Sequence, residues 1–310
     1  MNVAIVIPVF NRKDITLRCL DSLHSIRNDK YRIIVVDSGS TDGTREAIRE
    51  KYSGVILLET TPESWWAAAT NIGVKEAIKT GCKYILTYND DNVATTETLN
   101  KLVETAEQNP GSIISSVKCS YQNPDTVLFA GRRQSRFTDR SYFMNRGQKY
   151  DQIGTGIRKV DWLHGQCTLF PASVFETAGL FDEKAFPHLY ADDDLILRAK
   201  QAGHELLVNL DAVVLNDENQ TGINPYYSRM NIRNISELLT STKSFFQLKT
   251  KTRFLWRHKR NILTFLITWV ADYARLFAVI LLRWVLPEKM YKKIEKSYQQ
   301  LVSGQDISAR

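Results

Sequence analysis

The sequence has few cysteines and none in a CxxC pair. The four that it has lie far apart: Cys19, Cys82, Cys119 and Cys167. Their spacing argues against a disulfide framework or a zinc knuckle, and it favours a reducing compartment. The first apolar run, residues 3–10, has no basic region before it and is too short for a secretion signal. The sequence therefore predicts a first strand here and a cytoplasmic location.

A glycine-rich phosphate loop is also missing after the first apolar run, where Pro8-Val9-Phe10-Asn11-Arg12 stands instead. A dinucleotide-binding oxidoreductase would carry GxGxxG at this point, so that class is disfavoured. A sugar nucleotidyltransferase of related fold would carry a glycine-rich, basic loop there, which this sequence also lacks. The candidate chemistry therefore lies in other loops.

The composition excludes several classes of protein. Apolar residues make up 43% and charged residues 24% of the chain, values typical of a soluble globular protein and not of a collagen-like, disordered or polytopic membrane protein. The net charge of +7 comes from residues 249–296, which hold twelve Lys or Arg against three acidic residues. Subtracting this +9 from +7 leaves −2 on the other 262 residues. A nucleic-acid-binding function is not indicated.

Short β-branched runs alternate with helical stretches up to about residue 120, which predicts βαβ units. The expected strands are residues 3–7, 33–36, 55–58, 84–88 and 112–117, and the expected helices are 14–26, 44–51, 67–79 and 96–107. Residues 120–225 have shorter strands and longer loops, with helices expected at 172–178 and 192–202. We predict an α/β fold with a doubly wound, mostly parallel sheet, followed by a helical, aromatic and basic extension.

Polar residues after strands are the first candidates for a site, because ligands bind beyond the carboxyl ends of strands in open α/β sheets. Asp37 opens the segment Asp37-Ser-Gly-Ser-Thr-Asp-Gly-Thr44 and could accept hydrogen bonds from a ribose or a base. The alternative is a simple turn with Ser40 or Thr41 as the helix N-cap.

Two further clusters are acidic. Asn89-Asp90-Asp91 follows an apolar strand, where adjacent carboxylates favour a divalent cation that also binds phosphate oxygens. The alternative is a surface turn that caps a helix. Asp192-Asp193-Asp194 opens a helix, where one carboxylate could serve as a general base or all three could be caps.

Taken together, the clusters resemble the family 2 inverting glycosyltransferases of the GT-A fold, over roughly residues 1–235. The segments that carry the resemblance are Ile7-Pro-Val-Phe-Asn-Arg12, Val35-Val-Asp-Ser-Gly-Ser-Thr-Asp-Gly-Thr44, Trp66-Ala-Ala-Ala-Thr-Asn-Ile-Gly73, Asn89-Asp-Asp91, Ala178-Gly-Leu-Phe-Asp-Glu183, Ala191-Asp-Asp-Asp-Leu-Ile-Leu-Arg198 and Tyr226-Tyr-Ser-Arg-Met-Asn231. The chain looks most similar to the bacterial branch that adds rhamnose or similar sugars to cell-surface polysaccharides.

The resemblance implies roles for individual residues. Asp37 would bind the nucleotide base or ribose, Asp90 the ribose or donor sugar, and Asp91 a Mg²⁺ or Mn²⁺ ion. Asp192 would be the general base. The residues expected to bind the donor are Pro8, Phe10, Asn11, Arg12, Asp37, Ser38, Gly39, Asn71, Asp90, His164 and Gly165. Of these, His164 is included because the small Gly165 beside it would let a substrate approach the backbone, and a structural histidine is the alternative.

The sequence departs from the family pattern at the base and at the metal. Ala191 stands where the family has an acidic residue before the base, so Asp194 is a second candidate for that role. Asn89 replaces the first acidic residue of the metal motif. Asn216 and Asp217 stand where many members have a histidine, and we expect Asp217 to substitute as an oxygen ligand or water to fill the position.

The sequence therefore predicts a metal-dependent inverting glycosyltransferase with a nucleotide-sugar donor, dTDP-rhamnose or a UDP-sugar. Its acceptor is expected to be a saccharide, lipid-linked, in bacterial surface-polysaccharide synthesis. The alternative is a catalytically degenerate sugar-nucleotide-binding subunit that anchors or regulates an active partner. Trp65 and Trp66 are candidates for the cleft, with ordinary packing as their alternative.

Residues 236–310 are expected to form an extension to a catalytic domain of residues 1–235. Its most apolar part, residues 262–286, would form a helix about 37 Å long. Asp272, Arg275 and Arg283 argue against a membrane-spanning helix, and they fall within an arc of about 80°, which predicts a polar stripe. We expect this helix to hold the protein on the anionic, cytoplasmic face of a membrane. The alternative is that its apolar face packs on the catalytic domain or on a second copy of the chain.

Overall fold

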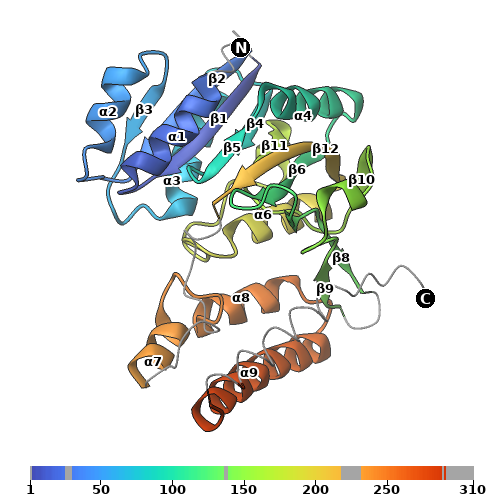
Figure 1. The fold of residues 1–310 in the computed structure, drawn as a ribbon. Helices are drawn as coiled ribbons and strands as arrows, with labels where there is room; N and C mark the ends of the chain where they lie inside the picture. The colour runs from blue at the N-terminus through green and yellow to red at the C-terminus, as the bar shows by residue number, and fades with distance from the viewer. Residues whose placement is uncertain (1, 25–29, 136–138, 218–231, 288–289, 291–310) are drawn as a thin grey trace.

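The structure is a computed structural model, and it describes residues 2–24, 30–135, 139–217, 232–287 and 290. An α/β domain and a layer of three C-terminal helices make up the described part of the chain (Figure 1). Tyr226 to Asn231, the last segment of the family resemblance, lies outside the described residues.

One ten-stranded sheet forms the centre of the α/β domain, in the order β10-β12-β6-β11-β4-β1-β2-β3, with β5 on β12 and β7 on β6. The strands are β1 (Val3–Val9), β2 (Tyr31–Asp37), β3 (Ile56–Glu59), β4 (Tyr84–Thr87), β5 (Asn92–Ala94), β6 (Ile113–Ser120), β7 (Val127–Phe129), β10 (Ile157–Lys159), β11 (Thr168–Pro171) and β12 (Leu206–Asn216). Strands β4, β1, β2 and β3 are parallel, as are β6 and β12, whereas β11 runs antiparallel between β4 and β6. A separate hairpin pairs β8 (Arg132–Gln134) with β9 (Ser141–Phe143).

Helices cover both faces of the sheet, which explains why a central strand such as β1 is apolar at every position. The helices are α1 (Lys13–His24), α2 (Thr44–Lys51), α3 (Trp66–Lys79), α4 (Thr96–Gln108), α5 (Ser173–Thr177) and α6 (Ala191–Gln201), with a 3₁₀ turn at Tyr150–Gln152. In β1, Ile5 and Ile7 pack with α1, α2 and α4, whereas Ala4 and Val6 pack with α3, α5 and α6. Helix α3 lies so close to β1 that a Cβ at Gly73 would collide with Val6.

The α/β fold and its mostly parallel sheet are confirmed. The five expected strands correspond to β1, β2, β3, β4 and β6, and the expected helices to α1 through α6. A further strand-like run at residues 167–170 corresponds to β11, but neither its antiparallel position in the sheet nor the short strand β5 was expected, because their pairing partners are distant in sequence. Strand β12, for example, pairs with β6 through Leu206 and Ile113.

The C-terminal helices are α7 (Ile232–Thr240), α8 (Leu248–His258) and α9 (Ile262–Val285). Helix α9 begins at a capping box, in which the Asn261 side chain accepts a hydrogen bond from the Thr264 amide. Helix α8 packs on the α/β domain through Phe254, whose ring lies 5.8 Å from that of Trp162 between centroids. The domain boundary expected at residue 235 falls inside α7, and the division into two domains stays a prediction.

Candidate active site

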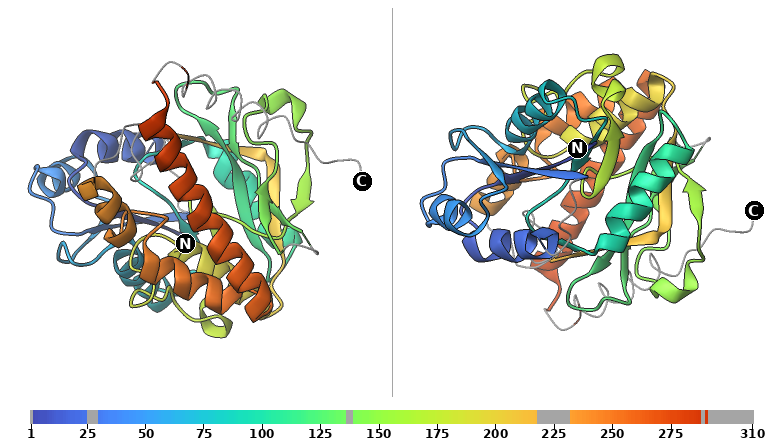
Figure 2. Two further views of the ribbon diagram at one scale, coloured as in Figure 1. Left: turned by 90° about the horizontal axis from the view of Figure 1, so that it is seen from below. Right: turned by 90° about the horizontal axis from the view of Figure 1, so that it is seen from above.

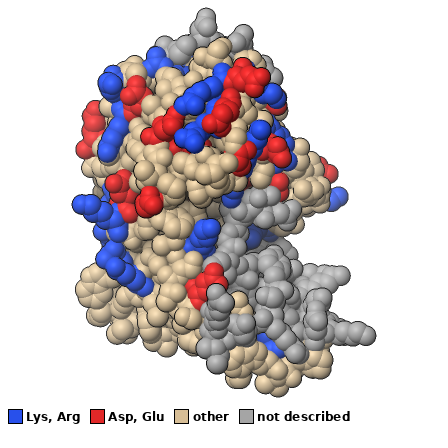
Figure 3. Space-filling model, turned by 90° about the vertical axis from the view of Figure 1, so that its left-hand side faces the viewer, with Lys and Arg blue, Asp and Glu red and all other residues tan. Residues whose placement is uncertain are grey.

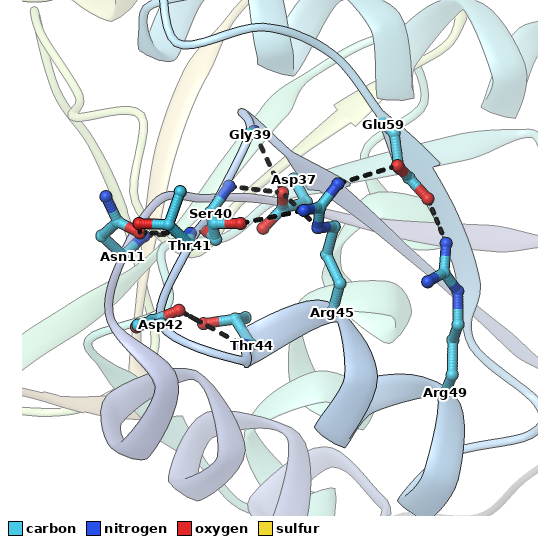
Figure 4. Close-up of polar contacts among 10 residues, drawn as sticks. All are labelled: Asn11, Asp37, Gly39, Ser40, Thr41, Asp42, Thr44, Arg45, Arg49 and Glu59. Atoms are coloured by element: carbon cyan, nitrogen blue, oxygen red, sulfur yellow. Dashed lines mark hydrogen bonds and ion pairs between the residues drawn. The ribbon is translucent and has the colours of Figure 1, made fainter.

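The loop after β1 is joined to the loop after β2 by Asn11. Its amide donates a hydrogen bond to Ser40 Oγ (2.9 Å), and its side-chain Oδ1 accepts one from the Thr41 amide (2.7 Å) (Figure 4). Asn11 has a φ of 50°, a left-handed conformation that Asn tolerates better than most residues. Two of the segments that resemble the family are therefore held together. Phe10, beside Asn11, is exposed.

Asp37 ends β2 and is fully buried. One carboxylate oxygen accepts hydrogen bonds from the amides of Gly39 (3.0 Å) and Ser40 (2.8 Å), and Arg45 Nε lies 3.7 Å away (Figure 4). The other oxygen, Oδ2, has no hydrogen-bond partner among the described residues. A buried oxygen without a partner is costly, so this atom is suited to accept a hydrogen bond from a ligand.

The loop after Asp37 needs its glycine. Gly39 has a φ of 81°, and a Cβ there would lie 2.9 Å from Pro62 Cδ. Ser38 donates its hydroxyl to the carbonyl of Ser64 (3.0 Å) and so fixes the loop from the other side. The alternative that Ser40 or Thr41 caps α2 is wrong, because the N-cap is Gly43.

Asp90 and Asp91 follow β4 and are both buried beside Arg12. Arg12 Nη1 lies 3.1 Å from Asp90 Oδ1 and 3.8 Å from Asp91 Oδ2. Burial raises the pKa of Asp90 to about 6, although Arg12 opposes the shift. Burial also raises the pKa of Asp91, again against the charge of Arg12. One arginine thus lies beside two buried carboxylates, which makes the pair suited to a further cationic ligand.

Asp91 and Asp217 lie together because β5 pairs with the end of β12. The amide of Asp217 donates to the carbonyl of Asp91 (3.0 Å), and Asn216 Nδ2 donates to Asp91 Oδ1 (2.9 Å). Arg18 forms an ion pair with Asp217 Oδ2 (3.1 Å). Asp91 Oδ2 and Asp217 Oδ1 are buried and have no hydrogen-bond partner among the described residues.

These two oxygens fit a hard divalent cation, which binds oxygen ligands. They supply only part of a coordination shell. Among the described residues, no group of three or more His, Cys, Asp or Glu side chains is placed to hold a metal ion. A cation here would need phosphate oxygens or water as its remaining ligands.

Asp192 lies in the first turn of α6 and faces the loop before β11. Its Oδ2 accepts a hydrogen bond from the Gly165 amide (2.8 Å), and Thr87 Oγ1 on β4 donates to the Gly165 carbonyl (2.6 Å). A Cβ at position 165 would lie 2.5 Å from Asp192 Cβ, so only glycine allows this approach. Asp192 is partly exposed, and the Gly165 bond is the hydrogen bond its side chain makes within the described part of the chain. Its other oxygen can therefore meet a substrate.

The two following aspartates have different surroundings. Asp193 accepts a hydrogen bond from Trp162 Nε1 and lies 3.8 Å from Arg132, and burial raises its pKa to about 6. Asp194 is 0% exposed. Its carboxylate is paired with Arg198 (2.8 Å), Arg257 (2.9 Å) and His258 (2.8 Å). These ion pairs connect α6 with α8. Because Asp194 is buried and already paired, Asp192 is favoured over Asp194 as the residue that contacts a substrate.

His164 and Asn71 are both buried. His164 Nδ1 accepts a hydrogen bond from the Gln166 amide (2.9 Å), and burial with nearby Lys118 and Arg132 lowers its pKa well below the ordinary value. Its Nε2 has no partner among the described residues. Asn71 instead uses its side chain internally, donating to the Phe181 carbonyl (2.9 Å) and accepting from the Phe181 amide (3.0 Å). In this structure Asn71 positions the loop before α6.

The two tryptophans differ as well. Trp66 packs edge-on against Phe181, with ring centroids 5.2 Å apart, and donates to Asn89 Oδ1 (3.0 Å), which supports the packing alternative. The Trp65 ring lies 5.7 Å from that of His188, a residue that the sequence did not single out. His188 precedes Asp192 by four residues, and burial lowers its pKa to about 4. Trp65 and His188 thus form an aromatic pair near the start of α6.

Lys118 is a second residue that sequence reasoning missed. It lies in β6 and donates to Gln166 Oε1 (3.0 Å). Burial lowers its pKa to about 8, while the charges of Asp91 and Asp192 oppose the shift. The available signal was a lysine directly after the strand expected at residues 112–117. Its positive charge interacts with both Asp91, the candidate metal ligand, and Asp192, the candidate base.

Two hollows lie outside this cluster, between the β8–β9 hairpin and α8, with volumes of about 320 and 610 Å³. Both are lined by Gln134 and His258, and neither is lined by Asp37, Asp91 or Asp192. The polar clusters at the strand ends therefore remain the candidate active site.

The sequence matches a known family of proteins. The sequence model of Glycosyl transferase family 2 matches residues 4–178, more than half of the chain. The poly(ribitol-phosphate) beta-glucosyltransferase of Bacillus spizizenii is 33% identical over 119 residues, 36% of this chain and 18% of that enzyme. The N-acetylglucosaminyl-diphospho-decaprenol L-rhamnosyltransferase of Mycobacterium tuberculosis is 24% identical over 207 residues, 60% of this chain and 66% of that enzyme. These matches cover only part of the relatives' length, less than a fifth in the first case.

Solved structures share the fold. S. aureus TarS (residues 1–349) superposes with a TM-score of 0.52 at 14% identity, over 97% of this chain and 92% of that one. GalNAc-T7, solved with UDP, GalNAc and Mn²⁺, superposes with a TM-score of 0.58 at 14% identity, over 88% of this chain and 54% of that one. At these identities the likeness establishes the fold alone, and it confirms the expected GT-A architecture.

Proposed function

The chain belongs to glycosyl transferase family 2, and from this premise we propose that it is an inverting glycosyltransferase of bacterial surface-polysaccharide synthesis. Its donor is a nucleotide-diphosphate sugar, dTDP-rhamnose or a UDP-sugar. Its acceptor is a saccharide carried on a lipid. The observation that carries the proposal is the partly exposed Asp192 carboxylate, held by the Gly165 amide at the start of α6.

Asp192 acts as the general base in this proposal. It removes the proton from an acceptor hydroxyl, whose oxygen then forms a bond to the anomeric carbon of the donor sugar. The bond from that carbon to the diphosphate breaks on the opposite face, and the nucleoside diphosphate leaves with the bonding electrons. The anomeric configuration inverts in one step. The Gly165 hydrogen bond supports the role because it fixes one carboxylate oxygen and leaves the other for the acceptor.

Asp37 and Asp90 bind the nucleotide part of the donor in this proposal. The unpartnered Asp37 Oδ2 supports contact with a base or ribose, since it is buried and aimed away from the amides that hold Oδ1. A UDP complex is known for GalNAc-T7, a protein of the same fold. The rhamnosyl donor is suggested by the M. tuberculosis relative, whose name also specifies a diphospho-decaprenol acceptor.

Asp91 and Asp217 would hold Mg²⁺ or Mn²⁺. The unpartnered oxygens Asp91 Oδ2 and Asp217 Oδ1 support this assignment, and GalNAc-T7 was solved with Mn²⁺. When bound, the cation would supply positive charge to the departing diphosphate. Arg12, beside both Asp90 and Asp91, holds these carboxylates in place before donor binds.

The degenerate-subunit alternative stays open through Ala191, Asn89 and Asn216. Asn216 donates to Asp91 and so orients this carboxylate, which a ligand-binding subunit also needs. A thermal-shift screen of nucleotide sugars with Mg²⁺ or Mn²⁺ tests donor binding. A screen of nucleoside-diphosphate release by the purified full chain then separates enzyme from subunit: binding without release from any donor would favour the degenerate subunit.

A further inference from the structure

Helix α9 is amphipathic, but its apolar side faces outward and its more polar side faces the protein. In a surface helix of a soluble protein, the apolar stripe faces the core and the polar stripe faces water. In α9 the polar residues Thr268, Asp272 and Arg283 lie on the side that packs on the protein. Of the three charged residues that define the expected polar stripe, Asp272 and Arg283 lie on the inward side, whereas Arg275 is exposed.

The inward side of α9 is matched by polar groups of α8. Lys251 on α8 forms a 2.8 Å ion pair with Asp272, and Trp269 Nε1 donates to Thr252 Oγ1 (2.8 Å). Tyr273 packs beside them with Leu276 and α7. Asp272, one of the three charges that argued against a membrane-spanning helix, is therefore neutralised within the protein.

The outward side of α9 is almost wholly apolar. Its exposed large apolar residues are Ile262, Leu263, Leu266, Ile267, Val270, Phe277, Leu281, Leu282, Trp284 and Val285. At 100° per residue they occupy an arc of about 200°. The helix crosses the underside of the molecule as its outermost element, so no described segment covers this arc (Figure 2). The alternative that the apolar face packs on the catalytic domain does not agree with this arrangement.

This side is much larger than the scattered apolar residues of an ordinary surface. Val270 and Leu281, near the middle of the arc, are 57% and 59% exposed. Charged side chains crowd the α/β domain, whereas the lowest described surface of the helical layer is mostly uncharged (Figure 3). A surface of this kind needs an apolar partner.

The charge around the face identifies the partner. Residues 249–286 contain eight Lys or Arg and a single acidic residue, Asp272. Lys251, Arg257 and Lys259 form ion pairs within the protein, and Arg283 is buried. Lys249, Arg260 and Arg275 are exposed and give this layer its positive surface charge. Two copies of the chain meeting through α9 would bring two such segments together, and like charges would oppose that contact. An anionic lipid surface offers both an apolar layer and negative headgroups. Trp256, which packs edge-on against Phe265, and Trp284 lie toward the two ends of α9, where interfacial tryptophans are favoured.

We propose that α9 lies in the plane of an anionic lipid bilayer, with its apolar side in the acyl region and its polar side on α7 and α8. The helix is long and apolar enough to cross a membrane by length and composition. Crossing would break the Lys251–Asp272 pair and the Trp269–Thr252 bond, so the in-plane position is favoured.

This placement connects the candidate active site to the membrane-bound layer. Arg257, on α8, pairs with Asp194 in the first turn of α6, two residues after Asp192. The layer that rests on the lipid is thus attached directly to the helix that carries the candidate base. The placement itself rests only on α9 and does not depend on the proposed reaction.

Flotation of the purified full chain with vesicles tests the inference. We expect the protein to float with vesicles of phosphatidylcholine and phosphatidylglycerol (3:1) and to float at least fivefold less with phosphatidylcholine alone. The double variant Val270→Asp/Leu281→Asp should lose flotation. The matched control Ile157→Asp, at a 46% exposed apolar position on β10, should float like the unmodified protein.

Three results would overturn the inference. The first is an unmodified protein that stays in the soluble fraction with anionic vesicles. The second is an α9-dependent dimer in solution, seen by light scattering and abolished by the double variant. The third is vesicle-bound protein that resists alkaline carbonate extraction, which would indicate a spanning helix. Unchanged circular dichroism of the double variant shows that its loss of flotation does not come from unfolding.

Discussion

The Gly165 amide donates a 2.8 Å hydrogen bond to Asp192 Oδ2, and the glycine leaves no room for a β-carbon beside Asp192. This contact joins the loop before β11 to the first turn of α6. It fixes the direction of one carboxylate in a run of three that the sequence could not separate. Two predictions follow from it directly, one for each partner.

Replacing Asp192 with Asn should leave donor binding intact and reduce transfer by about 10²-fold or more, because an amide cannot accept the acceptor's proton. Calorimetry with the donor and steady-state assays of sugar transfer measure the two effects. Asp193→Asn, one residue further along α6, serves as a comparison with the same change in charge. Near-normal turnover of Asp192→Asn, combined with an inactive but folded Asp194→Asn, would move the role to Asp194.

Replacing Gly165 with Ala should lower kcat by roughly 10- to 100-fold with little change in donor affinity, since the new Cβ would lie 2.5 Å from Asp192 Cβ and displace the carboxylate. Gly54→Ala is the matched control, because a Cβ there meets nothing within 4 Å. If the two variants had equal kcat, the Gly165 contact would have no role in orienting the base.

Replacing Asp91 with Ala should abolish cation-dependent binding of a nucleoside diphosphate, because it removes the buried oxygen that fits the metal. Asp217→Asn should weaken the cation's effect less. Titration calorimetry of UDP with and without Mn²⁺ measures both, and Asp151→Ala, at an exposed carboxylate far from β4 in sequence, is the control. Unchanged transfer in excess chelator would remove the metal from the mechanism.

The Asp194 carboxylate should make stability dependent on pH. Burial raises its pKa, but the hydrogen bond from His258 and the charges of Arg198 and Arg257 outweigh burial and hold the pKa below the ordinary value. A lowered pKa in the folded state stabilises the protein above the unfolded pKa of about 4, and this contribution is lost as the pH falls through the folded pKa.

Asp194→Asn should therefore be less stable than the unmodified protein near neutral pH, by roughly 3–5 kcal/mol, since it breaks a buried ion-pair network. Denaturant unfolding at several pH values measures the difference, which should shrink below about pH 4. A difference that stayed constant down to pH 2 would contradict the role of the carboxylate charge.

Much of the fold was predictable because β-branched runs and helical patterns are local. Asp37, Asp91 and Asp192 became candidates for the same reason, as acidic residues next to strand ends or a helix start. The partners of these residues were not predictable. Asn71 was expected to bind the donor, but it bonds to Phe181, 110 residues away. Asp194 was a second candidate for the base, and its pairing with Arg257, 63 residues away, had no local signal in the sequence.

The same limit applies to α9. Its periodicity showed a polar stripe, but periodicity alone does not say which side of a helix meets the protein. That side was determined by Lys251 and Thr252 on α8, which offer polar partners to Asp272 and Trp269. Tertiary contacts of this kind have no local signal in the sequence.

The most direct test of the proposed reaction is the anomeric configuration of the product. The purified full chain is incubated with each candidate nucleotide sugar, a lipid-linked saccharide acceptor and Mg²⁺ or Mn²⁺, and the product is examined by proton NMR. Direct displacement by an acceptor hydroxyl activated by Asp192 predicts a product whose anomeric configuration is opposite to that of the donor. A product with retained configuration would contradict the account.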